Sequence, residues 1–570
     1  MKHGLLSLSS GSCHRSASQL LTQGSKAKVI NRIMTRDASV YSSQAKLKAL
    51  VANRLGWVDV ASGMQKKIAE IEKFGNQALK DGIRHVVLIG MGGSSLCPEL
   101  FGLVFGKHSK IRSYHVLDST DPVAVASVDR KIELGKTLFI VASKSGGTIE
   151  TRSHEAYFWH RLQQELVKNP GKHFAAITDK GSDLEKSSKK NKYRHVFVNP
   201  SDIGGRYSAL SFFGLVPAFF AGCDLKKLLT NAVAMEELLR TRTDETNPGL
   251  ALGTLMAAAW KAGRDKLTFV ASAKSAPLVP WIEQLVAEST GKHKKGIVPI
   301  EHEPLLPVGK YGQDRVFVFC RFDKESNKQK GFAAKLQKMN VPVVEMVLDS
   351  SYDLGGQFLL WEAATAVAGW HMKINPFDEP NVTESKQNTM AILAAFEKIG
   401  SMPIGTPHAI HGNLSLLLDD KSRRTRKNGS LKSAVHKLLG QGKAPRYVAL
   451  LNYFASDAQS EIELDKIRAL IGGKTGVATL RGYGPRFLHS IGQLYKGGAP
   501  KGVFVVFVRN QYARLGIPGK VFDFGQLITA QAIGDTQALV SRKLPVLLIG
   551  LDGVPSKALR EFQSIVRSAR

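Results

Sequence analysis

Cysteine is scarce in this chain, and the few cysteines are isolated. Four occur among 570 residues, at positions Cys13, Cys97, Cys223 and Cys320. They form no CxxC pair and no His/Cys cluster with metal-site spacing, which excludes a disulfide framework and a zinc centre. Such cysteine usage is typical of a reducing compartment, and it predicts a cytoplasmic protein without a bound metal.

Long apolar runs and N-terminal acidic residues are also absent. No stretch approaches the roughly 18 apolar residues of a membrane-spanning helix, so no membrane association is expected. Residues 1–36 contain no Asp or Glu but several basic residues and many serines. We expect this basic, Ser-rich segment to be a disordered leader or tail. An organellar transit peptide is the alternative, and it would change the location.

Acidic residues are far fewer than basic ones, and the formal net charge is +31. A nucleic-acid binder could have such a balance. The basic residues are widely spread, however, and the densest run, Lys421–Lys427, is typical of a solvated loop. No zinc-finger spacing or aromatic-interleaved basic segment accompanies it. We therefore expect no nucleic-acid partner, and a positive field that draws anionic substrates instead.

What the chain does have is an alternation of strand-like and helix-like segments. Its apolar content of 43% is enough for two or three packed domains. Short apolar runs separated by helical patterns predict an α/β fold with parallel sheets. We expect a first unit over residues 37–224, a second over residues 225–378, and a mixed α/β region over residues 379–570.

Two apolar strands of the first unit end in loops rich in glycine and serine. His85–Ile89 leads into GMGGSS at Gly90–Ser95, and Thr137–Ala142 leads into SKSGGT at Ser143–Thr148. Backbone N–H groups bared by glycine, together with a helix N-terminus, favour an anion. Neither loop contains GxxxxGK[ST], so a nucleoside triphosphate is not indicated. The pattern points to a small phosphorylated metabolite.

Other interpretations of the first loop remain open. Its glycines could form only a tight strand-to-helix turn. Gly90-x-Gly92, with Asp118 after the next strand, could also belong to a dinucleotide site. Ser95 stands at the position of the third glycine of that fingerprint, which weakens it. The second loop favours a sugar phosphate.

The motifs GMGGSS, VASKSGGTIET, GGRYSAL and VAESTGKHKKG occur in this order. Together they resemble glucose-6-phosphate isomerase, in particular the isomerase part of transaldolase–isomerase fusions, from about Asp37 to Arg509. The resemblance implies two tandem sugar-isomerase (SIS) subdomains, each a three-layer α/β/α unit. It also implies glucose 6-phosphate/fructose 6-phosphate isomerisation without a cofactor. A transaldolase activity is not expected, because its barrel needs about 250 residues and only 36 precede the isomerase-like part.

The resemblance assigns the chemistry that moves a proton between C1 and C2. Such a step needs one carboxylate and a fixed cation beside the developing oxyanion. Glu288 matches the family base, Gln284 a glutamine near the sugar, and Arg206 the arginine beside C1 and C2. Judged on the residues alone, Glu288 could be an exposed acid and Arg206 a structural arginine at the subdomain junction.

For the phosphate group, the resemblance implies the second loop. Ser143, Ser145 and Thr148 would hold the dianion, and Ser94 would assist. Gly93 would leave room for the substrate, and Lys144 lies within the loop without being catalytic. Some of these serines could instead only cap the following helix.

Ring opening is assigned to Lys386 and His489. Lys386 closes INPFDEPNVTESK, where the family reads roughly INSFDQxGVELGK. His489 lies in FLHSIGQLYKGG, after the lysine instead of before it, so His371 and His293 remain fallback candidates. In the family this histidine comes from a neighbouring subunit, which implies a homodimer.

Alternative functions remain open at this point. One is a related isomerase acting on mannose 6-phosphate, and another is a non-catalytic SIS-type regulator that binds phosphosugars. An oxidoreductase with a dinucleotide fold is the most distant. A regulator would not need Glu288 together with Arg206, and their joint presence favours an enzyme.

Overall fold

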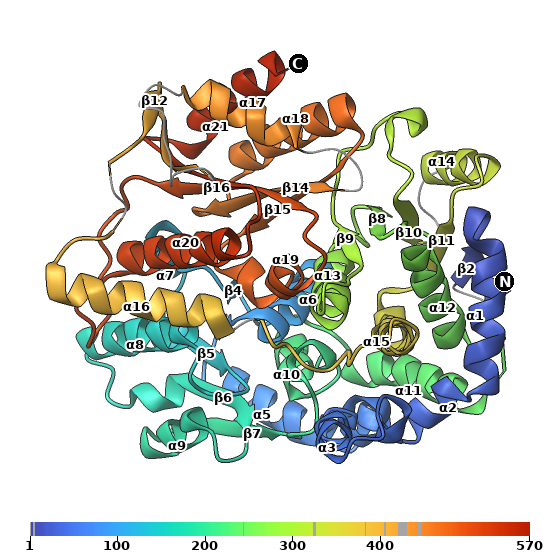
Figure 1. The fold of residues 1–570 in the computed structure, drawn as a ribbon. Helices are drawn as coiled ribbons and strands as arrows, with labels where there is room; N and C mark the ends of the chain where they lie inside the picture. Colours follow the sequence, from blue (N-terminus) through green and yellow to red (C-terminus); the bar gives the residue numbers. More distant parts are fainter. Residues whose placement is uncertain are drawn as a thin grey trace.

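The computed structural model contains three β-sheets, each with helices on both faces (Figure 1). It describes residues 2–569 except 4–5, 243, 323–326, 382, 404–405, 420–429 and 442–445. The basic run Lys421–Lys427 lies outside the described residues. Among those that are described, no helix combines the length and apolarity required to cross a membrane.

The first sheet consists of five parallel strands in the order β4-β3-β5-β6-β7. The strands are β3 His85–Gly90, β4 Ser113–Leu117, β5 Thr137–Ala142, β6 Phe174–Asp179 and β7 His195–Asn199. The helices of this region are α5 Ile68–Lys80, α6 Leu96–Phe105, α7 Pro122–Asp129, α8 Ile149–Gln164, α9 Asp183–Lys190 and α10 Phe212–Phe220. All residues of β3 and β5 are buried, which explains why both strands are apolar after their first residues, His85 and Thr137.

The second sheet has six strands in the order β1-β2-β11-β10-β8-β9. Its parallel strands are β8 Lys266–Ala271, β9 Val298–Ile300, β10 Arg315–Phe322 and β11 Val343–Leu348, and its antiparallel edge is β2 Leu6–Ser9 with β1 Lys2–His3. The helices here are α11 Leu225–Thr241, α12 Pro248–Lys261, α13 Leu278–Thr290, α14 Asn327–Lys338 and α15 Leu354–His371. Between Ser9 and the first sheet lie α1 His14–Lys26, α2 Val29–Met34, α3 Ala45–Ala52 and α4 Val60–Gln65.

The expectation of a disordered segment over residues 1–36 is wrong for residues 6–36. Strand β2 pairs with β11, and α1 packs against α12. Helix α2 buries all four of its apolar side chains. Charge and serine content suggest disorder here, whereas the helical spacing of the apolar residues indicates the helices that form.

The third sheet lies in the C-terminal region and also has six strands, in the order β12-β13-β17-β16-β14-β15. The strands are β12 Ala409–His411, β13 Leu414–Asp419, β14 Tyr447–Tyr453, β15 Ala478–Tyr483, β16 Gly502–Arg509 and β17 Val546–Leu551. The helices are α16 Thr383–Ile399, α17 Leu431–Gly440, α18 Ala458–Thr475, α19 Gly492–Gly497, α20 Phe524–Ser541 and α21 Pro555–Ser568. Helices α16 and α20 contribute Ile392, Phe524 and Leu527 to a core shared with β3 and β5, so the third region packs directly on the first.

The three sheets share one strand order. In each, the second parallel strand in the chain lies beside the first, and the third and fourth follow on the other side: β4-β3-β5-β6, β9-β8-β10-β11 and β15-β14-β16-β17. The predicted α/β class with parallel SIS-type sheets is confirmed. The C-terminal region repeats the same order with an added antiparallel edge. The proposed domain boundaries stay a prediction.

Candidate active site

A pocket of about 470 Å³ opens beyond the carboxyl ends of β3, β5 and β6. Loops after these strands form part of its wall, and the rest comes from α13, α16 and two short 3-10 helices, η7 Gly205–Tyr207 and η10 Arg486–His489. The pocket is lined by every residue predicted for the site: Gly93, Ser94, Ser143, Lys144, Ser145, Thr148, Arg206, Gln284, Glu288, Lys386 and His489. All three sheet regions therefore meet at one place.

The first glycine-rich loop brings two other segments close together. Gly92 has φ +56°, and a Cβ atom there would stand 2.4 Å from the carbonyl oxygen of His489. A Cβ on Gly93 would stand 2.1 Å from the carbonyl oxygen of Gly205. Side chains at these two positions would push η7 and η10 away. The glycines thus allow Arg206 and His489 to reach the same pocket.

The second loop presents hydroxyl groups at the start of α8. Ser143 Oγ accepts a hydrogen bond from the Gly146 amide at 3.1 Å and lies 3.2 Å from Thr148 Oγ1. Helix α8 is 16 residues long and begins directly after Thr148, so its partial positive charge reinforces this anion-binding arrangement. Lys144 differs, because its ammonium group is paired with Asp179 and donates to the Ser201 carbonyl at 3.0 Å.

Arg206 is buried and held on every side of its guanidinium group. Nε donates to Ser289 Oγ at 2.8 Å, and Nη2 donates to the carbonyl oxygens of Pro376 and Asp378 at 2.8 and 2.9 Å. Nη1 lies 3.0 Å from Glu379 Oε2 and 3.4 Å from Glu288 Oε1. The cation is therefore fixed in orientation, with one nitrogen directed at the carboxylates of the pocket.

Glu288 lies near the C-terminal end of α13, with its side chain 13% exposed. Burial raises the pKa of this carboxyl above its ordinary value of 4.5, and nearby Glu379 adds to the rise while Arg206 opposes it. One helical turn earlier, Gln284 donates from Nε2 to Glu288 Oε2 at 3.1 Å and to the His489 carbonyl at 2.8 Å. This amide ties the carboxylate to η10.

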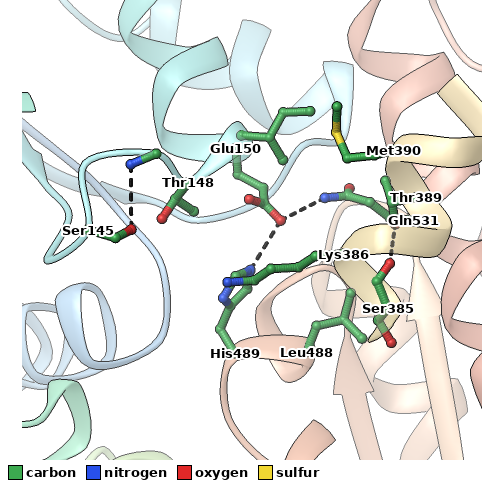
Figure 2. A pocket seen from close by; sticks show the side chains of 12 residues that line it. Ser145, Thr148, Glu150, Ser385, Lys386, Thr389, Met390, Leu488, His489 and Gln531 are labelled. Atoms are coloured by element: carbon green, nitrogen blue, oxygen red, sulfur yellow. Dashed lines mark hydrogen bonds and ion pairs between the residues drawn. The ribbon is translucent and has the colours of Figure 1, made fainter. Parts of the chain in front are cut away.

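His489 is oriented by a buried glutamate, as Figure 2 shows. Its Nε2 lies 3.1 Å from Glu150 Oε1, which also accepts from Gln531 Nε2 at 2.8 Å. Gln531 in turn accepts from Thr120 Oγ1 at 2.7 Å. Burial on its own would raise the pKa of Glu150, but the charge of His489 and its hydrogen bond outweigh burial, and the pKa is lowered. An ionised Glu150 means that Nε2 carries the proton.

Lys386 lies on the first turn of α16 and lines the same pocket as His489. It borders both the main pocket and a smaller hollow of about 190 Å³. No hydrogen bond or ion pair connects its ammonium group to any of the described residues. The lysine is thus an uncommitted cation at the pocket.

The fallback histidines do not reach the pocket. His371 is bonded through Nε2 to Thr254 Oγ1 at 3.1 Å, and burial lowers its pKa to about 4. His293 follows the end of α13 in a left-handed conformation. Neither lines the main pocket or the smaller hollow, whereas His489 lines both.

Three candidate residues of the site were not identified from the sequence. Glu150 follows SKSGGT by two residues, and its place on the first turn of α8 was a usable signal. Glu379 stands where the resembling family has glutamine in INSFDQ, a departure that could have drawn attention to it. Gln531 gave no signal, because nothing in its neighbourhood marks it as close to residue 150.

The expectation that the histidine comes from another subunit does not hold for this chain. His489 lines the pocket of the same chain that supplies Glu288 and Arg206. The reason given for a homodimer therefore disappears. The oligomeric state itself stays a prediction.

Residues 26–303 match the model of the Phosphoglucose isomerase family. A "Probable glucose-6-phosphate isomerase" of Methanococcus maripaludis is 27% identical over 372 residues, which is 58% of this chain and 82% of that protein. A "Glucose-6-phosphate isomerase" of Methanocaldococcus jannaschii is 27% identical over 341 residues, 54% of this chain and 84% of that protein.

Among solved structures, a hypothetical protein from Thermus thermophilus superposes with a TM-score of 0.58 at 24% identity, covering 68% of this chain and all of that one. A glucose-6-phosphate isomerase from Chlamydia trachomatis gives a TM-score of 0.53 at 20% identity, with 68% of this chain and 87% of that one covered. At these identities the structures show a shared fold.

Proposed function

This chain belongs to the phosphoglucose isomerase family through residues 26–303, and from that membership we propose that it interconverts glucose 6-phosphate and fructose 6-phosphate. The observation that supports this most is the 3.4 Å contact between Glu288 Oε1 and Arg206 Nη1 in the pocket that the hydroxyl-bearing loop lines. A protein that only binds sugar phosphates needs the loop, but it does not need a base held against a cation. The regulator alternative is therefore not favoured.

Glu288 is the proposed base. Isomerisation of the aldose to the ketose removes a proton from C2 and returns one to C1 through an enediol. A carboxylate whose pKa is raised by burial is a stronger base than an exposed one. Gln284 holds the carboxylate in place from one turn earlier on α13.

Arg206 is the proposed partner of the developing oxyanion. Guanidinium cannot lose its proton at working pH, so it stabilises the enediolate without entering the proton relay. Its bonds to Ser289, Pro376 and Asp378 orient the cation before the substrate arrives, so no reorganisation is needed during the reaction.

The phosphate group is proposed to sit at the start of α8. Ser143, Ser145 and Thr148 would donate hydroxyl hydrogens, and Ser94 would approach from the first loop. Gly93 leaves the space that a side chain would fill. Lys144 contributes little charge to this site because Asp179 neutralises it.

Lys386 and His489 are the proposed ring-opening pair. With Nε2 of His489 bonded to Glu150, Nδ1 is the nitrogen left to exchange a proton with the ring oxygen or the anomeric hydroxyl. Lys386 has no partner among the described residues, so its ammonium group can bind a sugar oxygen as the ring opens.

A single chain supplies every residue of this proposed mechanism. The homodimer and the cytoplasmic location remain part of the proposal. All four cysteines are free thiols, in keeping with a reducing compartment. Light scattering across a dilution series, with the activity of each species measured, would test whether the chain works alone.

A coupled assay on purified protein with fructose 6-phosphate, without added metal or nucleotide, tests the activity. Mannose 6-phosphate serves as the epimeric comparison in the same assay. We expect turnover of fructose 6-phosphate at a rate typical of metabolic enzymes, about 10 per second or more. Binding of the sugar phosphate without turnover would instead identify a regulator.

A further inference from the structure

A second cavity, of about 720 Å³, lies where the three sheet regions meet. Asp118 follows β4, Glu301 follows β9 and Gly484 follows β15, and all three line it. Each of these strands is the second parallel strand of its sheet (Figure 1). Open α/β sheets bind ligands outside the carboxyl ends of their strands. The cavity therefore occupies a position that suits a ligand.

Acidic side chains outnumber cations in its lining, although the whole chain is strongly basic. The charged residues are Glu99, Asp118, Glu283, Glu301, Glu461, Arg481 and Arg486. Both arginines are already engaged. Arg486 Nη1 lies 2.8 Å from Glu99 and 3.4 Å from Asp118, and Arg481 pairs with Glu461 and with Asp465, the latter at 2.9 Å.

The carboxyl groups of Glu283 and Glu301 form no ion pair with the described residues, although the charges of nearby arginines act on both. Glu283 is 7% exposed, and within the described ranges its carboxyl makes no hydrogen bond or ion pair. The same is true of the Glu301 carboxyl, whose Oε2 is buried. Burial, and after it the charge of Glu301, raise the pKa of Glu283 well above 4.5, although Arg486 and Arg468 oppose the rise. A buried, unpaired carboxyl is costly, and a cation placed beside it removes that cost.

The arrangement does not suit a metal ion. Among the described residues, no group of three or more His, Cys, Asp or Glu side chains is placed to hold one. The carboxyl groups of Glu283 and Glu301 line the same cavity, which has room for a molecule of several carbon atoms, so a ligand with two positive charges could pair with both. Alkyl ammonium groups provide such charges, and each can donate to a carboxylate.

We propose that this cavity binds a small aliphatic diamine, with its two ammonium groups paired to Glu283 and Glu301. The ligand would supply the direct ion pair that these two carboxyl groups do not form with the described residues. Its carbon chain would lie against the apolar part of the lining, which includes Leu96, Leu103 and Phe487.

The cavity shares two walls with the catalytic pocket. Glu283 directly precedes Gln284 on α13, and Gln284 bonds both Glu288 and the His489 carbonyl. Arg486 begins η10, which ends at His489. A bound diamine is therefore positioned to alter the isomerase reaction. That effect rests on the proposed function, whereas the binding itself does not.

Calorimetric titration of the full chain with 1,4-diaminobutane, without sugar, tests the binding. The neutral probe 1,4-butanediol has the same carbon chain and should produce no saturable heat. Variants Glu283→Gln and Glu301→Gln keep the shape of the side chain and should each weaken diamine binding about tenfold or more, because each removes one charge-assisted contact. Glu72→Gln, at an exposed position on α5, is the matched control and should bind as the native chain does.

Circular dichroism of each variant establishes that it has folded. Diamine binding that is undiminished in the folded double variant Glu283→Gln/Glu301→Gln would overturn the proposal. Saturable binding of Mg²⁺ with no diamine binding would overturn it as well. A protein that binds the diamine but does not isomerise fructose 6-phosphate would keep this inference and refute the proposed function.

Discussion

The pocket around Glu288 and the second cavity, called the acidic cavity from here on, both border α13 and η10. They differ in which of their charged residues are paired. In the pocket the acids are paired with the chain's own cations, Asp179 with Lys144, and Glu288 and Glu379 with Arg206. Lys386 is left uncommitted. In the cavity the arginines are committed, and Glu283 and Glu301 are left without partners among the described residues.

This difference indicates the charge of the ligand that each of the two suits. An uncommitted cation beside hydroxyl groups and a helix N-terminus suits an anion such as a phosphate. Uncommitted carboxyls suit a cation. The net charge of +31 cannot distinguish the two hollows, because the charge of the whole chain says nothing about which groups are already paired.

The largest expected effect comes from Glu288→Gln. The amide keeps the shape but cannot accept the C2 proton, so kcat should fall about 10²–10⁴-fold while sugar-phosphate binding stays within a few-fold. Exchange of the C2 proton with solvent deuterium, followed by NMR, measures the step directly, and the control is Glu72→Gln. Full turnover in Glu288→Gln would remove this residue from the role of base.

The next effect is expected from Lys386→Ala. Loss of the uncommitted ammonium group should slow the reaction of closed-ring sugar by about 10²-fold and that of an open-chain analogue much less. Stopped-flow rates with the two substrates give the comparison. Lys398→Ala, at an exposed position on the same helix, is the matched control. Equal slowing of both substrates would contradict a role in ring opening.

Glu150→Gln should weaken the orientation of His489, because the ring loses its contact with a carboxylate. We expect a roughly tenfold lower kcat with closed-ring sugar, little change in KM, and a normal rate with the open-chain analogue. Glu150→Asp, which keeps the charge, should recover part of the loss. If Glu150→Gln slowed the reactions of both substrates equally, Glu150 would be only a structural residue.

The pH profile offers a finer test. Because Glu288 must be ionised and its pKa is raised, the rate should fall as pH decreases through that raised pKa, at a pH above 4.5. Glu379 contributes to the rise, so Glu379→Gln should lower the pKa of Glu288 and move the acidic limb to lower pH. The kcat/KM profile measures it, and a shift to higher pH would contradict this pairing.

The smallest expected effect is on the pH dependence of thermal stability. The pKa of Glu283 is raised in the folded chain, so folding is disfavoured as pH rises above 4.5 and the unfolded chain releases its proton. Glu283→Gln removes this penalty and should raise the thermal midpoint at neutral pH by about 2 °C. The gain should vanish near pH 4, where the carboxyl is protonated in both states. A lower midpoint at pH 7 would mean that Glu283 has a stabilising partner.

Much of the fold could be predicted from local patterns. Strands β3, β5, β14, β16 and β17 consist mostly of apolar residues in succession, and buried strands have that appearance wherever they occur. Strand β2 was missed because four residues at a sheet edge carry little signal. Strand β15 carries a weaker signal, because only its first half is fully buried.

The candidate site was predictable to the extent that its residues lie in motifs. Gly93, Ser143 and Glu288 each occur in a short segment whose local chemistry or family resemblance marks it. Glu150 and Gln531 were not predictable, since their contact joins residues 381 positions apart. Helix packing brings them together, and no local pattern encodes which helix faces meet.

The sequence alone determined the strand-and-loop chemistry: glycines where three loops approach one another, hydroxyls at a helix start, and a carboxylate and an arginine in recognisable segments. Only the tertiary structure decided that His489 reaches the pocket from its own chain, that Glu150 holds it, and that Glu283 remains unpaired. The physical reason is that pairing of charges depends on distances between segments far apart in the chain, and folding alone establishes those distances.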